Sequence, residues 1–359
     1  MRGWKTFVLP LLAALRVSAH GYVSRVVIDG VVYAGNEPND NTGSSPIRMI
    51  STIDPVKGAN NLYLNCGQEA QAAAITAPAK PGSSVTFQWS GAPGGGDNWP
   101  HNVGPLMTYM TQCTTTNCAA FDSSSAEWFK IDELGMNSSN AWFQGYLTQG
   151  DSYTVTLPTS IKSGGYLIRH ELIALHQAVS IGGAEFYPSC TQVLISGSGD
   201  GTPSSGEMCT FPGGYSDTDP GIYVPDIYNG GLDYVFPGPN LSHLASAGDG
   251  MITAKVPGGD APPTGSTIAT STASVPVVAV PSGAGGSSGS SSPDSGSGSG
   301  SGDSSGTSVA AMPTAGAGSA AAPSPPKCAL KSSVAQTPLS TLSRRRLHHV
   351  IRRFFSRSS

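Results

Sequence analysis

Between residues 20 and 257, short runs in which apolar and polar residues alternate are separated by clusters of Gly, Pro, Asn and Ser. Alternation with a period of two is typical of half-buried strands, and the clusters are typical of turns. The alternating runs lie at 23–32, 84–89, 152–157, 166–174 and 192–196. The pattern predicts an all-β fold, either an antiparallel sandwich or a barrel. We expect short helices within 58–78 and 102–112.

Composition narrows the class of protein. Gly and Pro supply 46 and 28 of the 359 residues, and charged residues make up only 12 %. A coiled coil or helical bundle needs much less Gly and Pro, so both are excluded. Positions 20–259 hold eight Lys or Arg against twenty Asp or Glu. Such an acidic body does not suit nucleic acid, which requires a basic face.

The composition changes after the globular segment. We assign 258–326 as a flexible linker, because Gly, Ser, Ala, Pro and Thr dominate it and cannot form a core. The tail at 327–359 contains eight basic residues and no acid. It is either a basic segment that attaches to an acidic wall or membrane surface, or a disordered tail, or the product of an incorrect gene model.

Residues 1–19 have the features of a secretion signal. Arg2 and Lys5 precede a short apolar run, and Val17-Ser18-Ala19 offers small residues at a cleavage site. The run is too short to cross a bilayer, and no other stretch is apolar enough to do so. We therefore expect an extracellular protein that begins at His20. Asn137 and Asn240 each open an Asn-X-Ser glycosylation sequon.

An N-terminal histidine has two adjacent nitrogen ligands, the α-amine and the ring Nδ1. The α-amine has a pKa near 8, so a metal displaces its proton at modest cost. A second histidine would complete three nitrogens in a T-shaped arrangement, which suits copper. His20 is therefore a candidate copper ligand.

The segments that follow resemble a known family. They are the stretches His20-Gly21-Tyr22-Val23, Trp99-Pro100-His101-Asn102-Val103-Gly104-Pro105, Leu167 to His176, Gly183 to Cys190, Phe211 to Tyr215, and Phe236-Pro237-Gly238-Pro239. In this order they are similar to the fungal lytic polysaccharide monooxygenases of auxiliary activity family nine, formerly glycoside hydrolase family sixty-one. The resemblance covers about 20–250 and implies an immunoglobulin- or fibronectin-like β-sandwich with long loops and short helices.

The resemblance implies one copper ion per catalytic domain, which would span 20–257. His20 and His101 would supply three nitrogens, and Tyr187 would lie axially. His176 matches a histidine behind the metal, whereas Glu185 stands where the family usually has Gln. A carboxylate accepts hydrogen bonds but donates none unless protonated. We expect Glu185 and Tyr187 to share a strand face, and His176, Glu185 and Tyr187 to be catalytic.

The implied reaction is oxidative cleavage of β-1,4-glucan chains, such as cellulose, at C1, C4 or both. It would use O2 or H2O2 and an external electron donor, either a secreted dehydrogenase or a small reductant. Tyr234 and Tyr22 are candidates for stacking on sugar rings. We expect a monomer, with no nucleic-acid partner.

The resemblance also pairs Cys66 with Cys190 and Cys113 with Cys118. Cys209 and Cys328 then either pair across the linker or stay reduced. A C-terminal cellulose-binding module would need more Cys and aromatic residues after the linker, so we expect none.

Two other functions remain possible. The chain could be a secreted copper- or wall-polysaccharide-binding protein of the same fold without oxidative activity, which Glu185 slightly favours. A hydrolytic glycosidase would need two carboxylates at a set separation, and no such motif is recognisable.

Overall fold

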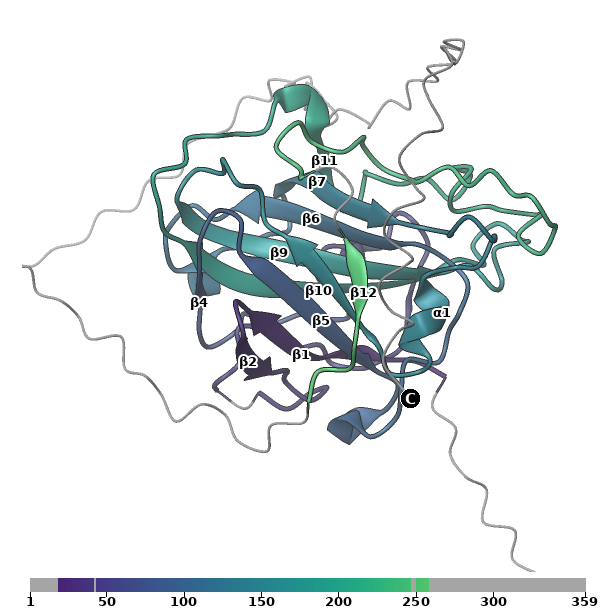
Figure 1. Ribbon diagram of the computed structural model, residues 1–359, viewed down its shortest axis with the longest axis horizontal. Helices are drawn as coiled ribbons and strands as arrows, with labels where there is room; N and C mark the ends of the chain where they lie inside the picture. The colour runs from purple at the N-terminus through teal and green to yellow at the C-terminus, as the bar shows by residue number, and fades with distance from the viewer. Residues whose placement is uncertain (1–18, 42, 247–249, 258–359) are drawn as a thin grey trace, which may run out of the picture. The chain divides into compact units, whose positions relative to one another are not determined.

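The computed structural model describes residues 19–41, 43–246 and 250–257, and these form a two-layer β-sandwich (Figure 1). The smaller sheet has the order β12-β8-β5-β1-β2 and is antiparallel throughout. Its strands are β1 (Tyr22–Ile28), β2 (Val31–Ala34), β5 (Ser84–Ser90), β8 (Ser152–Thr156) and β12 (Met251–Thr253). The predicted all-β fold is confirmed. Of the two predicted architectures, a sandwich and a barrel, the structure is the sandwich.

The larger sheet has the order β11-β7-β6-β9-β10-β3, with β4 added in parallel to β10. Its strands are β3 (Val56–Lys57), β4 (Ala77–Ala79), β6 (Leu106–Gln112), β7 (Glu127–Leu134), β9 (Gly164–Ala174), β10 (Glu185–Ile195) and β11 (Met208–Thr210). The short helical elements are η1 (Leu62–Leu64), η2 (Pro93–Gly95), η3 (Cys118–Ala120), α1 (Gln144–Leu147) and η4 (Ser205–Glu207). Among the described residues, no helix has the length and apolar character that crossing a membrane requires.

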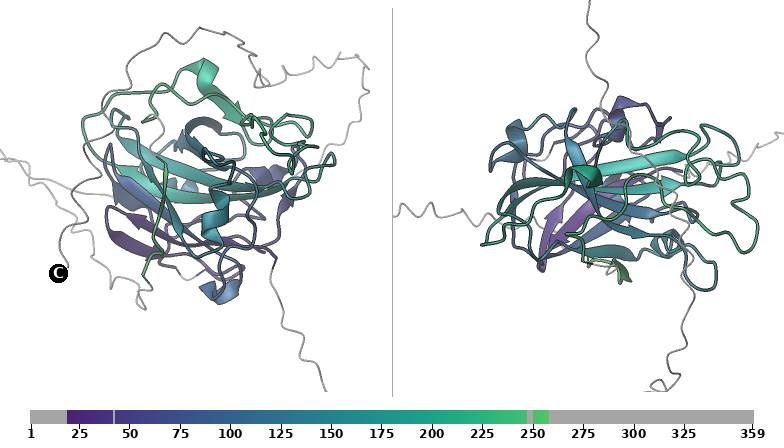
Figure 2. Two further views of the ribbon diagram at one scale, coloured as in Figure 1. Left: turned by 45° about the vertical axis from the view of Figure 1, so that its right-hand side comes forward. Right: turned by 90° about the horizontal axis from the view of Figure 1, so that it is seen from above.

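The larger sheet is buried on both faces. One face packs against the smaller sheet in a core that includes Phe87, Ile168 and Leu172. The other face packs against the long segment between β11 and β12, which supplies Phe211 and Ile222 to a second core (Figure 2). Strands β9 and β10 are therefore buried at almost every position, because both of their faces are covered.

The sequence analysis was wrong about the strand at the centre of the larger sheet. Residues 106–112 form strand β6 in the middle of the larger sheet and not a helix. Six of its seven residues are buried, and these include the polar Thr108 and Thr111, so apolar and polar residues do not alternate here with the period of two that identifies a strand. Within 58–78 the only helical element in the described chain is the three-residue η1. The run at 23–32 is two strands, because Asp29 and Gly30 have positive φ and form a tight hairpin turn.

Both predicted disulfides are present, and each has a cysteine on or directly after a strand of the larger sheet. Cys66 is bonded to Cys190 on β10, and Cys113 is bonded to Cys118, as the resemblance implied. Cys209 is buried on β11, and Cys328 lies outside the described residues. The predicted signal, linker and tail also lie outside the described residues, except for Ala19.

Candidate metal centre

His20 lies at the start of β1, where the chain enters the smaller sheet. Its side chain is one-third exposed, and Nδ1 lies 3.0 Å from Asp54 Oδ1. Gly21 allows the chain to pass close to its neighbours, because a Cβ there would collide with the Ser90 carbonyl and with Trp99. A side chain at position 21 would therefore displace His20.

His101 lies on the loop that joins β5 to β6. The buried Trp99 holds this loop, because its ring meets the ring of His101 edge to face at 5.2 Å and that of Tyr187 at 4.8 Å. Gly104 has a φ of 133°, and a Cβ there would collide with the Ile173 carbonyl on β9. Glycine is therefore required where the loop crosses β9.

Glu185 and Tyr187 lie on the same face of β10, as strand alternation predicted. The Tyr187 hydroxyl donates a hydrogen bond to Glu185 Oε2 at 3.0 Å. The same hydroxyl oxygen lies 3.1 Å from His101 Nε2. The ring centroids of His20 and His101 lie 6.4 and 5.7 Å from that of Tyr187, so the tyrosine lies near both histidines.

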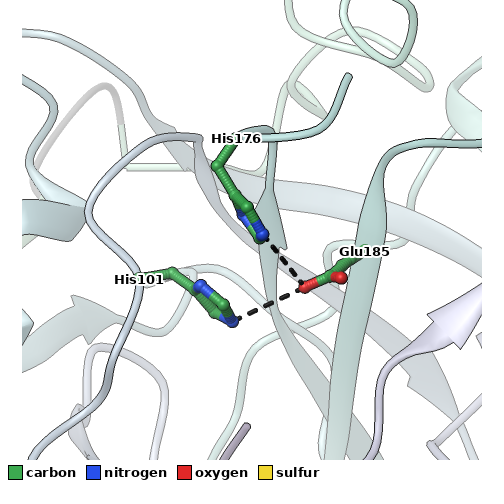
Figure 3. A group of neighbouring side chains, drawn as sticks. All are labelled: His101, His176 and Glu185. Atoms are coloured by element: carbon green, nitrogen blue, oxygen red, sulfur yellow. Dashed lines mark ion pairs between the residues drawn. The ribbon is translucent and has the colours of Figure 1, made fainter. Parts of the chain in front are cut away.

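His176 follows the end of β9 and completes the group (Figure 3). Its ring stacks on that of His101, with centroids 4.5 Å apart and planes inclined by 14°. His176 Nε2 lies 3.8 Å from Glu185 Oε2, and His101 Nε2 lies 3.5 Å from the same oxygen. Both Nε2 atoms face the carboxylate in Figure 3.

The stacking limits which atoms can bind one cation. The lone pair of an imidazole lies in the ring plane, so two nearly parallel rings direct their lone pairs side by side and not at one point. His101, His176 and Glu185 form a compact cluster of metal-binding residue types, but His101 and His176 are poorly oriented to bind the same ion. A metal at His101 would need further nitrogen donors from another element, and His20 is the histidine nearby.

Burial and charge set the ionisation of this group. Burial, together with the nearby His176, lowers the pKa of His101 to about 4, so its imidazole is neutral near pH 7. Burial raises the pKa of Tyr187 far above its ordinary value, and Glu185 raises it further, so the phenol keeps its proton. Burial also acts to raise the pKa of Glu185, but the Lys57 ammonium, the Tyr187 hydroxyl and His176 together hold this pKa below its ordinary value.

The donor set fits a copper ion. Neutral imidazoles are the form that binds metals, and the raised pKa of Tyr187 makes it a protonated, weak ligand. The backbone of Ala19 acts to raise the pKa of His101, so the peptide bond before His20 lies close to His101. Cleavage of that bond would free the His20 amine next to a neutral imidazole.

His170 is separate from this group. It is fully buried in the sandwich core, where it stacks on Phe87, and its Nδ1 lies 3.0 Å from Thr108 Oγ1. His170 therefore belongs to the core and not to the site.

Of the two tyrosines selected for stacking on sugars, one is buried and the other is partly buried. Tyr22 is only 3 % exposed, and its hydroxyl donates to Glu37. Tyr234 is partly buried, with its ring against Trp142 and Phe236 and its hydroxyl donating to the Gly221 carbonyl. The expectation was wrong for Tyr22, because β1 pairing buries its ring, whereas stacking by the partly buried Tyr234 stays a prediction.

Tyr228 is an exposed aromatic residue that the sequence analysis missed. Its ring is 67 % exposed, and its hydroxyl donates a 2.7 Å hydrogen bond to the backbone carbonyl of His176. This bond fixes an exposed aromatic ring next to the histidine cluster. Its sequence position, eight residues before the Phe236-Pro237 pair, gave no sign of its exposure.

Both glycosylation sequons lie at the surface. The Asn137 Oδ1 accepts hydrogen bonds from the amides of Ser139 and Ala141 in a turn, and Asn240 is exposed. Glycosylation of these residues stays a prediction.

Comparison with known proteins agrees with this geometry. Residues 20–234 match the model of Auxiliary Activity family 9, formerly GH61. The AA9 family lytic polysaccharide monooxygenase D of Gloeophyllum trabeum is 55 % identical over 251 residues, which are 69 % of this chain and 72 % of that protein. The crystal structure of a cellulose-active polysaccharide monooxygenase from M. thermophila has 32 % identity and a TM-score of 0.55, over 62 % of this chain and 98 % of that one. The extended catalytic domain of an H. jecorina enzyme, LPMO9A, has 30 % identity and a TM-score of 0.56, over 66 % of this chain and all of that one.

Proposed function

Because this chain belongs to Auxiliary Activity family 9, a family of lytic polysaccharide monooxygenases, we propose that it is a secreted, copper-dependent enzyme that cleaves cellulose or a related β-1,4-glucan. Cleavage would occur at C1, C4 or both, with O2 or H2O2 and an external electron donor. The observation that carries the proposal is the convergence of His101, His176, Glu185 and Tyr187 beside His20.

We assign metal binding to His20 and His101. The free amine and ring Nδ1 of a mature His20 would join His101 Nε2 in holding the metal, and the neutral Tyr187 hydroxyl, 3.1 Å from His101 Nε2, would be a weak ligand. Asp54, now 3.0 Å from His20 Nδ1, would give up this contact. Bound copper would supply the one-electron chemistry that activates the oxidant.

Glu185 and His176 would handle protons at this site. Glu185 Oε2 already accepts a hydrogen bond from the Tyr187 hydroxyl and lies 3.8 Å from His176 Nε2. His176 Nδ1 is buried and has no hydrogen-bond partner within the described structure. A buried polar atom without a partner costs free energy, so its retention is consistent with a functional role. We propose that this pair positions and protonates the reacting oxygen species.

The substrate would rest on the surface around His176, where Tyr228 offers an exposed ring. Aromatic faces bind the apolar faces of sugar rings by burying area without requiring charge. An acidic domain with few charged residues suits a neutral polysaccharide better than a polyanion. We propose Tyr228 in place of Tyr22 and Tyr234 as the principal stacking residue.

The first experiment tests the foundation of the site. Mass spectrometry of the secreted protein should find His20 at the N-terminus, and titration should find one copper per chain. Any other N-terminus would remove the amine ligand and contradict the proposed copper site.

The second experiment tests the reaction. Copper-loaded protein incubated with amorphous cellulose and ascorbate should release aldonic acids or C4-oxidised products. E185Q and H176A should slow turnover at equal copper occupancy, and H170F is the control histidine outside the cluster. Copper binding without oxidised products on any of several glucans would favour the alternative, a binding protein of the same fold.

A further inference from the structure

Lys57 contacts Glu185 from a neighbouring strand. Strand β3 contains only Val56 and Lys57 and pairs with the start of β10, where Lys57 lies opposite Glu185. The Lys57 Nζ lies 3.0 Å from Glu185 Oε1 and donates to the Gly183 carbonyl at 3.2 Å. Two acceptors on the same segment therefore hold the ammonium group in place.

This contact gives the two carboxylate oxygens different surroundings. Oε1 faces Lys57, whereas Oε2 faces the Tyr187 hydroxyl at 3.0 Å and the Nε2 atoms of His101 and His176 at 3.5 and 3.8 Å. The Glu185 side chain is 6 % exposed, while that of Lys57 is 43 % exposed. A carboxylate this buried needs a counter-charge, and Lys57 supplies it from the solvent side.

The geometry points to Lys57 as a positioning residue that directs Glu185 Oε2 toward the metal centre and prevents the carboxylate from turning to bind the metal itself. This inference rests on the proposed function, since it assigns Lys57 a role in the same copper site. Lys57 would not touch the substrate or the metal, and would act only through Glu185.

The same contact would orient an amide at position 185. Lys57 can only donate hydrogen bonds, so a glutamine there would turn its carbonyl oxygen toward Lys57 and its NH2 toward Tyr187 and the histidines. With Lys57 present, E185Q thus places a donor where Glu185 Oε2 is an acceptor. Without Lys57 the amide could take either orientation.

The first test uses the metal-free protein. Crystal structures of wild type, K57M and K57R should show the Glu185 carboxylate rotated in K57M, with the contact from Oε2 to the Tyr187 hydroxyl lost. K57R should keep the wild-type orientation, because arginine restores a donor and a positive charge. An unchanged carboxylate in K57M would overturn the inference, whether or not the protein binds copper.

The second test uses the copper-loaded protein. K57M should raise the ratio of Cu(II) to Cu(I) affinity about tenfold, because the negative charge beside the metal is no longer balanced; changes behind metal ligands commonly have effects of this size. A tenfold change lowers the reduction potential by about 59 mV. The Cu(II) EPR spectrum should change in K57M and return toward wild type in K57R.

The matched control is K80M. Lys80 is exposed and follows β4, which pairs with the opposite end of β10. K80M removes the same charge far from Glu185 and should leave the potential and EPR spectrum unchanged.

The outcomes separate the two proposals. A wild-type protein with His20 at its N-terminus that binds no copper would refute the proposed function, while the metal-free structures would still decide the role of Lys57. Copper binding with equal potentials and spectra in wild type and K57M would refute the role of Lys57 and leave the proposed function standing.

Discussion

The two disulfides should differ sharply in their contributions to stability. The bond from Cys66 to Cys190 closes a loop of 124 positions and ties the segment after η1 to the strand that carries Tyr187. The bond from Cys113 to Cys118 closes a loop of only five positions. Restricting the unfolded chain is worth about 5 kcal/mol for the first loop and about 2 kcal/mol for the second on the loop-entropy relation.

The perturbation is replacement of each pair by serine. Cys66, Cys190, Cys113 and Cys118 are all buried, with exposed fractions of 3, 0, 6 and 0 %, so burying new hydroxyls should cost similar amounts in the two variants. The difference between the variants therefore reports mainly the difference in loop length. We expect C66S/C190S to lose about 3 kcal/mol more stability than C113S/C118S.

Urea unfolding followed by tryptophan fluorescence would measure this difference. EDTA keeps copper from stabilising the folded state, since any ligand of the native protein raises its apparent stability. Equal losses in the two variants, or a larger loss for the short loop, would refute the reasoning. Such a result would mean that structure in the unfolded chain or local packing outweighs loop closure.

Three further predictions concern His170, Gly104 and Tyr228. Burial lowers the pKa of His170 to about 3 in the folded protein. In the unfolded chain the imidazole binds a proton below about pH 6.5, so the stability of the folded state should fall as the pH drops below this value. This group should contribute up to about 1.4 kcal/mol per pH unit. In H170F this part of the slope should disappear from urea unfolding measured across that window, and an unchanged slope would argue against a neutral, buried His170. Gly104→Ala should lose about 1–3 kcal/mol of stability and bind copper more weakly, because φ is positive and a Cβ meets the Ile173 carbonyl. Scanning calorimetry would measure the loss of stability, and titration calorimetry would measure copper binding. Gly96→Ala is the control for both, because position 96 has open space and a negative φ. Tyr228→Ala should weaken adsorption to cellulose about tenfold, or about 1.4 kcal/mol, with copper affinity unchanged. The control is Val31→Ala, which removes an exposed apolar group from the hairpin at the far end of β1. Equal adsorption by the two variants would count against a stacking role for Tyr228.

Local patterns predicted the all-β class and the strands β1, β2, β5, β8 and β9. Alternation identified β5 and β8 because each of these strands belongs to the smaller sheet, which packs on the core through one face. The same reasoning predicted that Glu185 and Tyr187 share a face, since side chains of a strand alternate whatever the rest of the fold does. It failed for β6, where apolar residues and the buried polar Thr108 and Thr111 follow one another without a period of two.

The sequence by itself determined the all-β class, the order of the motif segments and the residue types at the proposed metal centre. The tertiary structure alone decided which side chains meet and which are exposed. Lys57 contacts Glu185 and Gly183, the latter 126 positions away in the chain, because it lies on a two-residue strand that no local sequence pattern predicts. Tyr22, Tyr228 and Tyr234 are the same residue type, yet the first is buried, the second is exposed and the third is partly buried. Exposure and charge pairing depend on what packs against a residue from distant parts of the chain, and this information appears only when the two sheets and their loops are assembled.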